Sequence, residues 1–125
     1  MSHTLYLVEF IGVPRNHHAL FVRLDENERT GRLFNVTGNV QQGMVYESAP
    51  TESPEASPTF IGMTQLGRVS SADLQRIDDI CRSNPPPGKQ FDGTKRIDPK
   101  KPLRRCQEWT VESIQLLEAH QVLKH

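Results

Sequence analysis

Two cysteines and a pair of adjacent histidines are the residues whose chemistry depends most on where the fold places them. Cys106 follows Arg104 and Arg105 at the predicted start of a helix. Helix N-termini and neighbouring cations stabilise a thiolate, so this context predicts a lowered pKa for the Cys106 thiol. The alternative is a small side chain packed beneath Trp109. Cys81 lies near the end of a predicted helix on its apolar side, which predicts a packed, unreactive thiol.

A cysteine nucleophile needs a base, normally a histidine, and a third group that orients that base. His17 and His18 open a predicted strand over residues 17–24. Side chains alternate along a strand, so only one of the two histidines can face a given helix. The sequence leaves open which one does. A structural or exposed role for both is the alternative. The other three histidines lie near the chain ends and are expected at the surface.

Other kinds of site find little support in the sequence. The cysteines and histidines lack the CxxC or HxxxH spacing of a zinc site, and no glycine-rich phosphate loop or Gly-x-Ser-x-Gly elbow is present. We therefore expect no metal and no cofactor. Fifteen basic residues balance fifteen acidic ones, which argues against nucleic-acid binding through bulk charge and against disorder throughout.

The N-terminal residues lack a basic start followed by a long apolar stretch, and no apolar run approaches the ~20 residues of a membrane span. These features predict an intracellular, cytoplasmic protein without a signal peptide. In that compartment the two cysteines are expected to be free thiols.

Hydrophobic patterning predicts strands first and helices later in a single domain over residues 1–125. The strands are expected at 4–11, ending at Pro14, and at 17–24, 32–37, 43–48 and 59–66. Helices are expected from Ser70 to before Pro85, and over 105–120. Three prolines mark 49–58 as a flexible loop, and 85–105 is expected to be irregular. This order favours an α+β fold, with an antiparallel sheet of four to six strands and about two helices.

Six basic residues against one acidic residue concentrate in segment 95–105. RNA or phosphate binding is one interpretation of this segment. Aromatic residues do not interleave the charges and the chain is neutral overall, which makes a solvated loop the more common outcome and nucleic acid an unlikely partner. The same charges can instead steer an anionic substrate toward Cys106.

Two stretches of the sequence resemble a known group of proteins. His17-His18-Ala19-Leu20-Phe21-Val22 precedes Gly31-Arg32-Leu33-Phe34-Asn35-Val36, and Cys106-Gln107-Glu108-Trp109 comes last. This order resembles the circularly permuted papain-like folds, which include lecithin:retinol acyltransferase-like and NlpC/P60-related proteins. The Asn-His strand start and Cys-x-x-Trp helix start are also similar to a group of small fungal proteins. The resemblance covers residues 14–36 and 103–117.

By this resemblance, Cys106 takes the nucleophile position, His17 the base position and Asn35 the position of the orienting residue. His18 remains the alternative base. Acyltransferases of the permuted group often have histidine where this chain has Asn35, although asparagine can also orient an imidazole. We expect Arg104, Arg105 and Trp109, which flank the cysteine, to contact substrate.

The resemblance implies a cysteine-dependent hydrolase or acyl-transfer enzyme that acts on an amide, peptide or thioester. The partner would be a small-molecule or peptide substrate. A non-catalytic interaction module on the same fold is the first alternative, and RNA or phosphate binding through 95–105 is the second.

Overall fold

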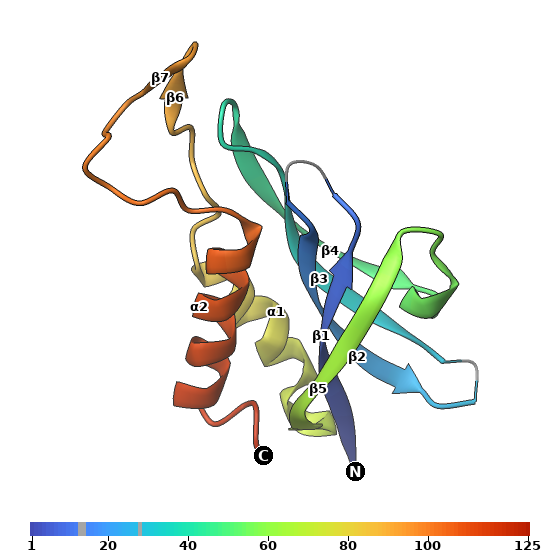
Figure 1. Ribbon diagram of the computed structural model, residues 1–125. Coiled ribbons are helices and arrows are strands. Elements are labelled where there is room, and N and C mark those ends of the chain that lie inside the picture. Colours follow the sequence, from blue (N-terminus) through green and yellow to red (C-terminus); the bar gives the residue numbers. More distant parts are fainter. Residues whose placement is uncertain (13–14, 28) are drawn as a thin grey trace.

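The computed structural model describes residues 1–12, 15–27 and 29–125 of the chain. Its described part is an α+β domain, as predicted. A five-stranded antiparallel sheet has the strand order β4-β3-β2-β1-β5, and the two α-helices cover one of its faces (Figure 1). Pro14, expected to end the first strand, lies outside the described residues.

The main sheet uses most of the first seventy residues. Its strands are β1 (Ser2–Phe10), β2 (His17–Asp25), β3 (Thr30–Asn39), β4 (Gly43–Thr51) and β5 (Phe60–Ser70). Short 3-10 turns occur at η1 (Pro54–Ala56) and η2 (Ser71–Asp73). The remaining elements are α1 (Leu74–Ser83), β6 (Phe91–Asp92), β7 (Lys95–Arg96) and α2 (Cys106–Ala119). No helix among the described residues has the length and apolar character to span a membrane.

The core lies between the helices and one face of the sheet. Alternate residues of the central strands, including Leu20 and Val22 on β2 and Phe34 on β3, point toward α2. Trp109 and Leu117 of α2 meet them, and both side chains are fully buried. The period of two in the strands and the helical spacing in α2 therefore produce one shared apolar layer.

The opposite face of the sheet has its own buried cluster around Arg23. The guanidinium of Arg23 lies 5.5 Å from the ring centre of Tyr6 and 5.3 Å from that of Phe21. It also pairs with Glu55 of η1 at 3.2 Å. Burial alone would raise the pKa of Glu55. Hydrogen bonds, including one from Arg29, and the charge of Arg23 lower that pKa to about 2.

The loop expected at 49–58 contains fewer irregular residues in the structure than predicted. Strand β4 continues to Thr51, and η1 occupies part of the remainder. Pro50 is tolerated because β4 is an edge strand, where a missing N–H removes no hydrogen bond from the sheet. Strand β5 also runs beyond its expected end, since Ser70 pairs with Ser2 at the start of β1.

The segment 85–105 holds more structure than predicted. A small hairpin forms where β6 pairs with β7, and Gly93 in its turn has a positive φ of 62°. The segment is attached to the end of the main sheet by two hydrogen bonds: Met44 N–H donates to Pro87 O, and Gln90 N–H donates to Val40 O. Figure 1 shows the β6–β7 hairpin extending beyond that end of the sheet, above the first turn of α2 in this view.

Candidate functional site

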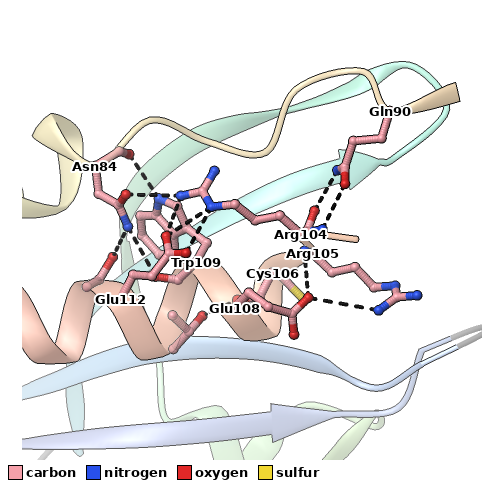
Figure 2. A network of polar contacts seen from close by, with 10 residues as sticks. Asn84, Gln90, Arg104, Arg105, Cys106, Glu108, Trp109 and Glu112 are labelled. Carbon is pink, nitrogen blue, oxygen red and sulfur yellow. Dashed lines mark hydrogen bonds and ion pairs between the residues drawn. The ribbon is translucent and has the colours of Figure 1, made fainter. Parts of the chain in front are cut away.

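A network of hydrogen bonds fixes the start of α2 (Figure 2). The Arg104 guanidinium donates to Glu112 at 2.6 and 2.9 Å and to Asn84 Oδ1 at 3.0 Å. Asn84 Nδ2 donates to Ser113 Oγ, and Trp109 Nε1 donates to the Asn84 carbonyl, each at 3.0 Å. These bonds tie the end of α1 to two turns of α2 and so set the direction of the second helix.

The backbone just ahead of the helix is held from the other side. The side-chain amide of Gln90 accepts from Arg104 N–H at 2.8 Å and donates to Arg104 O at 2.7 Å. Arg105 N–H donates to Glu108 Oε1 at 2.8 Å, which satisfies a donor that the helix leaves free. Cys106, the first residue of α2, therefore has a well-defined position.

The sulfur of Cys106 faces into the protein, and the residue is only 7% exposed. Burial raises the pKa of the Cys106 thiol above its ordinary value of 9.0, and the charge of Glu108 also raises it. The backbone N–H groups of His18, Cys106 and Gln107 favour the thiolate but do not outweigh burial.

The lowered pKa expected from the sequence is therefore wrong. The neighbouring cations do not compensate for burial, because Arg104 pairs with Glu112 and Arg105 lies 3.9 Å from Glu108. The thiol is protonated at neutral pH.

His17 is held by Asn35 on the neighbouring strand. Asn35 Nδ2 lies 2.9 Å from His17 Nε2, and the Phe10 ring stacks against the imidazole at 6.2 Å between ring centres. Asn35 itself is 8% exposed. With Nδ2 as the donor, Nε2 accepts and the imidazole carries its proton on Nδ1. Burial lowers the pKa of His17 below 6.5, and the nearby His18 lowers it further.

Cys106 and His17 line one cavity of about 380 Å³. The register between β2 and β3 begins at Leu20, so the described pairing stops short of His17 and the cavity lies at that end of the sheet. Its described wall also includes Gly12, Arg15, Met44, Arg105, Gln107 and residues 37–41 from the end of β3 and the turn after it. Across residues 1–12, 15–27 and 29–125, no hydrogen bond joins the imidazole directly to the sulfur.

His18 lies on the other side of its strand. Its Nε2 is 3.9 Å from Glu9 Oε2, and it shares the helix-facing side of β2 with Leu20. The backbone N–H of His18, rather than its ring, is the group that reaches the Cys106 sulfur. His17 therefore lies on the side of β2 away from α2, and it is the one of the two histidines that lines the cavity at the end of the strand.

The three residues expected to contact substrate have different places. Trp109 is fully buried in the core, with its Nε1 bonded to Asn84, so it supports the fold and does not contact substrate. Arg104 is engaged by Glu112 and lines a separate hollow of about 510 Å³ with residues of 87–103. Arg105 alone of the three lines the cavity of Cys106.

Sequence reasoning missed Gln107 and Arg15 in the cavity wall. Their signal was position, since each is close in sequence to a residue that was singled out. Gln107 Nε2 donates to Asn16 O, which joins the start of α2 to the residue before β2. This bond therefore links the two elements that carry Cys106 and His17.

Part of the basic segment is engaged in contacts within the segment itself. Arg96 donates to the backbone carbonyls of Asp98 and Lys101, and its guanidinium lies 5.7 Å from the ring centre of Phe91. The exposed cations that remain are Lys95, Lys100 and Lys101. Within the described residues, no group of three or more His, Cys, Asp or Glu side chains could hold a metal ion.

These observations define a class: a small α+β domain in which a cysteine at a helix start and a histidine at a strand start share one cavity. The chain belongs to DUF6540, a family of unknown function whose model matches residues 5–124. The match includes both the histidine and the cysteine. No curated protein and no solved structure matches the chain.

Proposed function

We propose that this protein is a cysteine-dependent hydrolase or acyl-transfer enzyme acting on an amide, peptide or thioester. The observation that supports it most is that Cys106 and His17, with His17 held by Asn35, line the same cavity. The chain order of a histidine strand, an asparagine strand and a cysteine helix also agrees with a permuted papain-like core, which forms part of the proposal.

The proposed reaction starts from a neutral thiol and a neutral imidazole. The Cys106 sulfur bonds to the substrate carbonyl carbon as its proton passes to His17 Nδ1. For that transfer Nδ1 must be free, so the neutral ring first moves its single proton from Nδ1 to Nε2, and the Asn35 amide turns to present Oδ1 to the Nε2–H. Backbone N–H groups at the start of α2 stabilise the oxyanion.

The second half of the reaction restores the enzyme. The leaving amine or thiol takes the proton from His17 as its bond to the carbonyl carbon breaks, which leaves a thioester on Cys106. Water, or an acceptor amine, then attacks the thioester while His17 takes its proton. The carboxylic acid or new amide departs and the proton returns to the Cys106 sulfur.

The pKa directions decide the pH dependence of this reaction. His17 acts as a base only when it is neutral, and its pKa lies below 6.5 because of burial. As the pH falls, activity is therefore expected to decrease only when the pH reaches the lowered pKa of His17. A thiolate–imidazolium pair is not required at rest, since the pKa of Cys106 is raised and that of His17 is lowered.

The test is single-turnover acylation by 4-nitrophenyl acetate, followed by nitrophenolate release and by peptide mass spectrometry. We expect acylation at Cys106, with an acid limb set by His17. In His17→Ala that limb should vanish, leaving a rate that follows the thiol's own ionisation above pH 9.0. Cys81 is the internal control, because burial raises its pKa to about 12.

The competing outcome is equally clear. If Cys106 remains unacylated while the protein is folded, the enzyme proposal is wrong, and a non-catalytic interaction module becomes the better account. If Cys106 is acylated at the same rate with and without His17, the cysteine is accessible but the assigned base is wrong.

A further inference from the structure

The charge of the cavity wall is one-sided. Arg15 and Arg105 both line the cavity, and no carboxylate does so among the described residues. Glu108 lies outside the wall and approaches Arg105 at 3.9 Å, which offsets part of the Arg105 charge and leaves that of Arg15. His17 and Cys106, the titratable groups of the wall, are both neutral at neutral pH. A ligand in this cavity therefore meets positive charge.

Gln107 also lines this wall. Its Nε2 donates to Asn16 O, while its Oε1 is buried and, among the described residues, has no hydrogen-bond partner. A buried acceptor without a partner is costly, and a ligand N–H that the Gln107 amide turns to meet removes that cost. An amide N–H is such a donor, and a carboxylate is not.

We propose that the site acts on an amide that carries a carboxylate near the scissile bond, with Arg15 and Arg105 binding the carboxylate and Gln107 accepting from the amide N–H. This inference rests on the proposed function and names its substrate class. The wall is otherwise mainly uncharged, with Gly12, Met44 and residues 37–41 forming its remaining surface. The arginines therefore supply the main discrimination between charged and neutral substrates.

The carboxylate is tested with two matched pairs of chromogenic esters. The first pair is 4-nitrophenyl hydrogen adipate and its neutral methyl ester, which differ in the acyl part. The second is 3-carboxy-4-nitrophenyl acetate and 4-nitrophenyl acetate, which differ in the leaving group. We expect about tenfold faster acylation of Cys106 by the anionic member of at least one pair, after correction for each probe's reactivity with free cysteine.

Arginine variants assign that preference to the wall. Arg15→Gln and Arg105→Gln should each slow the anionic probe several-fold more than the neutral probe. Lys95→Gln is the matched control, because Lys95 is exposed on β7 and does not line the cavity. A preference that persists in both arginine variants, or that Lys95→Gln removes equally, overturns the inference.

Gln107 is tested with an ester and a 4-nitroanilide of the preferred acid. Gln107→Met should slow the anilide, which has an N–H, more than the ester, which has none. Equal slowing of both probes overturns the role of Gln107.

The two proposals fail in different ways. Acylation of Cys106 by anionic and neutral probes at equal corrected rates overturns the carboxylate inference and leaves the proposed function standing. Absence of acylation by every probe overturns the proposed function itself.

Discussion

Replacing Asn35 with aspartate tests the proposed role of this residue as the partner of His17. Asn35 Nδ2 donates to His17 Nε2 over 2.9 Å, which places the ring proton on Nδ1 and disfavours a second proton. A carboxylate at the same place can only accept. It therefore requires a proton on Nε2, frees Nδ1 to act as base, and stabilises the imidazolium.

The size of the effect follows from distance and burial. An opposite charge within about 4–6 Å shifts a pKa by about 1–3 units. Asn35 is nearly buried, so solvent screens the new charge little, although burial also opposes ionisation of the aspartate. We expect the pKa of His17 to rise by about one to two units, which corresponds to about 1.4–2.7 kcal/mol in favour of the protonated ring.

The assay follows the acid limb of Cys106 acylation and, independently, the NMR shift of the His17 ring proton against pH. In the wild type both should titrate below 6.5, and in Asn35→Asp both should titrate higher. Below its pKa the ring is charged and cannot accept a proton, so Asn35→Asp should be less active than the wild type on the acid side.

Asn39→Asp is the matched control, because Asn39 is an exposed asparagine of the same strand that lines the cavity. It adds the same charge in solvent and should move the limb by only a few tenths of a unit. If Asn35→Asp folds normally and leaves the His17 titration unchanged, the two side chains do not interact in solution. The proposed role of Asn35 as the partner of His17 is then wrong. A rise that Asn39→Asp matches would point to a general charge effect.

Three further changes test the fold around the site. Trp109→Ala should cost about 3–5 kcal/mol of unfolding free energy in urea, because it removes a fully buried ring. Glu55→Gln should weaken the dependence of stability on pH: the lowered pKa of Glu55 contributes stability above about 4.5 that is lost as pH falls toward 2. Gly31→Ala should prevent normal folding, since its new Cβ would lie 1.9 Å from Val22 O, whereas Gly62→Ala meets nothing within 4 Å.

Each of these predictions has a result that contradicts it. A loss below about 1 kcal/mol in Trp109→Ala would mean that α2 is not packed against the sheet as described. An unchanged acid transition in Glu55→Gln would remove Glu55 from the groups linked to folding. Equal stability of the Gly31 and Gly62 variants would mean that β2 and β3 do not approach as closely as the register implies.

The fold was largely predictable because most elements have regular patterns. Burial on one face produces alternation of apolar residues along β2 and β3 and helical spacing of apolar residues in α2, and both patterns are visible in the sequence. The ends of β4 and β5 were less predictable. Pro50 is typical of a loop, but an edge strand tolerates it, and the edge position of β4 depends on pairing that no local pattern records.

The site was predictable in part. His17 and Asn35 were assigned together from the resemblance, and their side chains are bonded in the structure. The acidity of Cys106 was predicted wrongly, because the sequence shows that arginines are adjacent but not that Glu112 and Glu108 engage them. Burial of the sulfur beneath the backbone of β2 is likewise a tertiary effect.

The two halves of the site, His17 and Cys106, are positioned by different sets of contacts. His17 depends on the sheet, through Asn35 and the stacked ring of Phe10. Cys106 depends on the network around Arg104, which ties α2 to Asn84 at the end of α1 (Figure 2). Besides the core packing between α2 and the sheet, the Gln107 bond to Asn16 and the approach of the sulfur to the His18 backbone N–H join the two halves close to the cavity. Because Gln107, Cys106 and His17 all line the cavity, a ligand there contacts both halves and bears directly on the distance between thiol and imidazole. Substrate binding is therefore the step at which the two groups can be brought into reacting geometry.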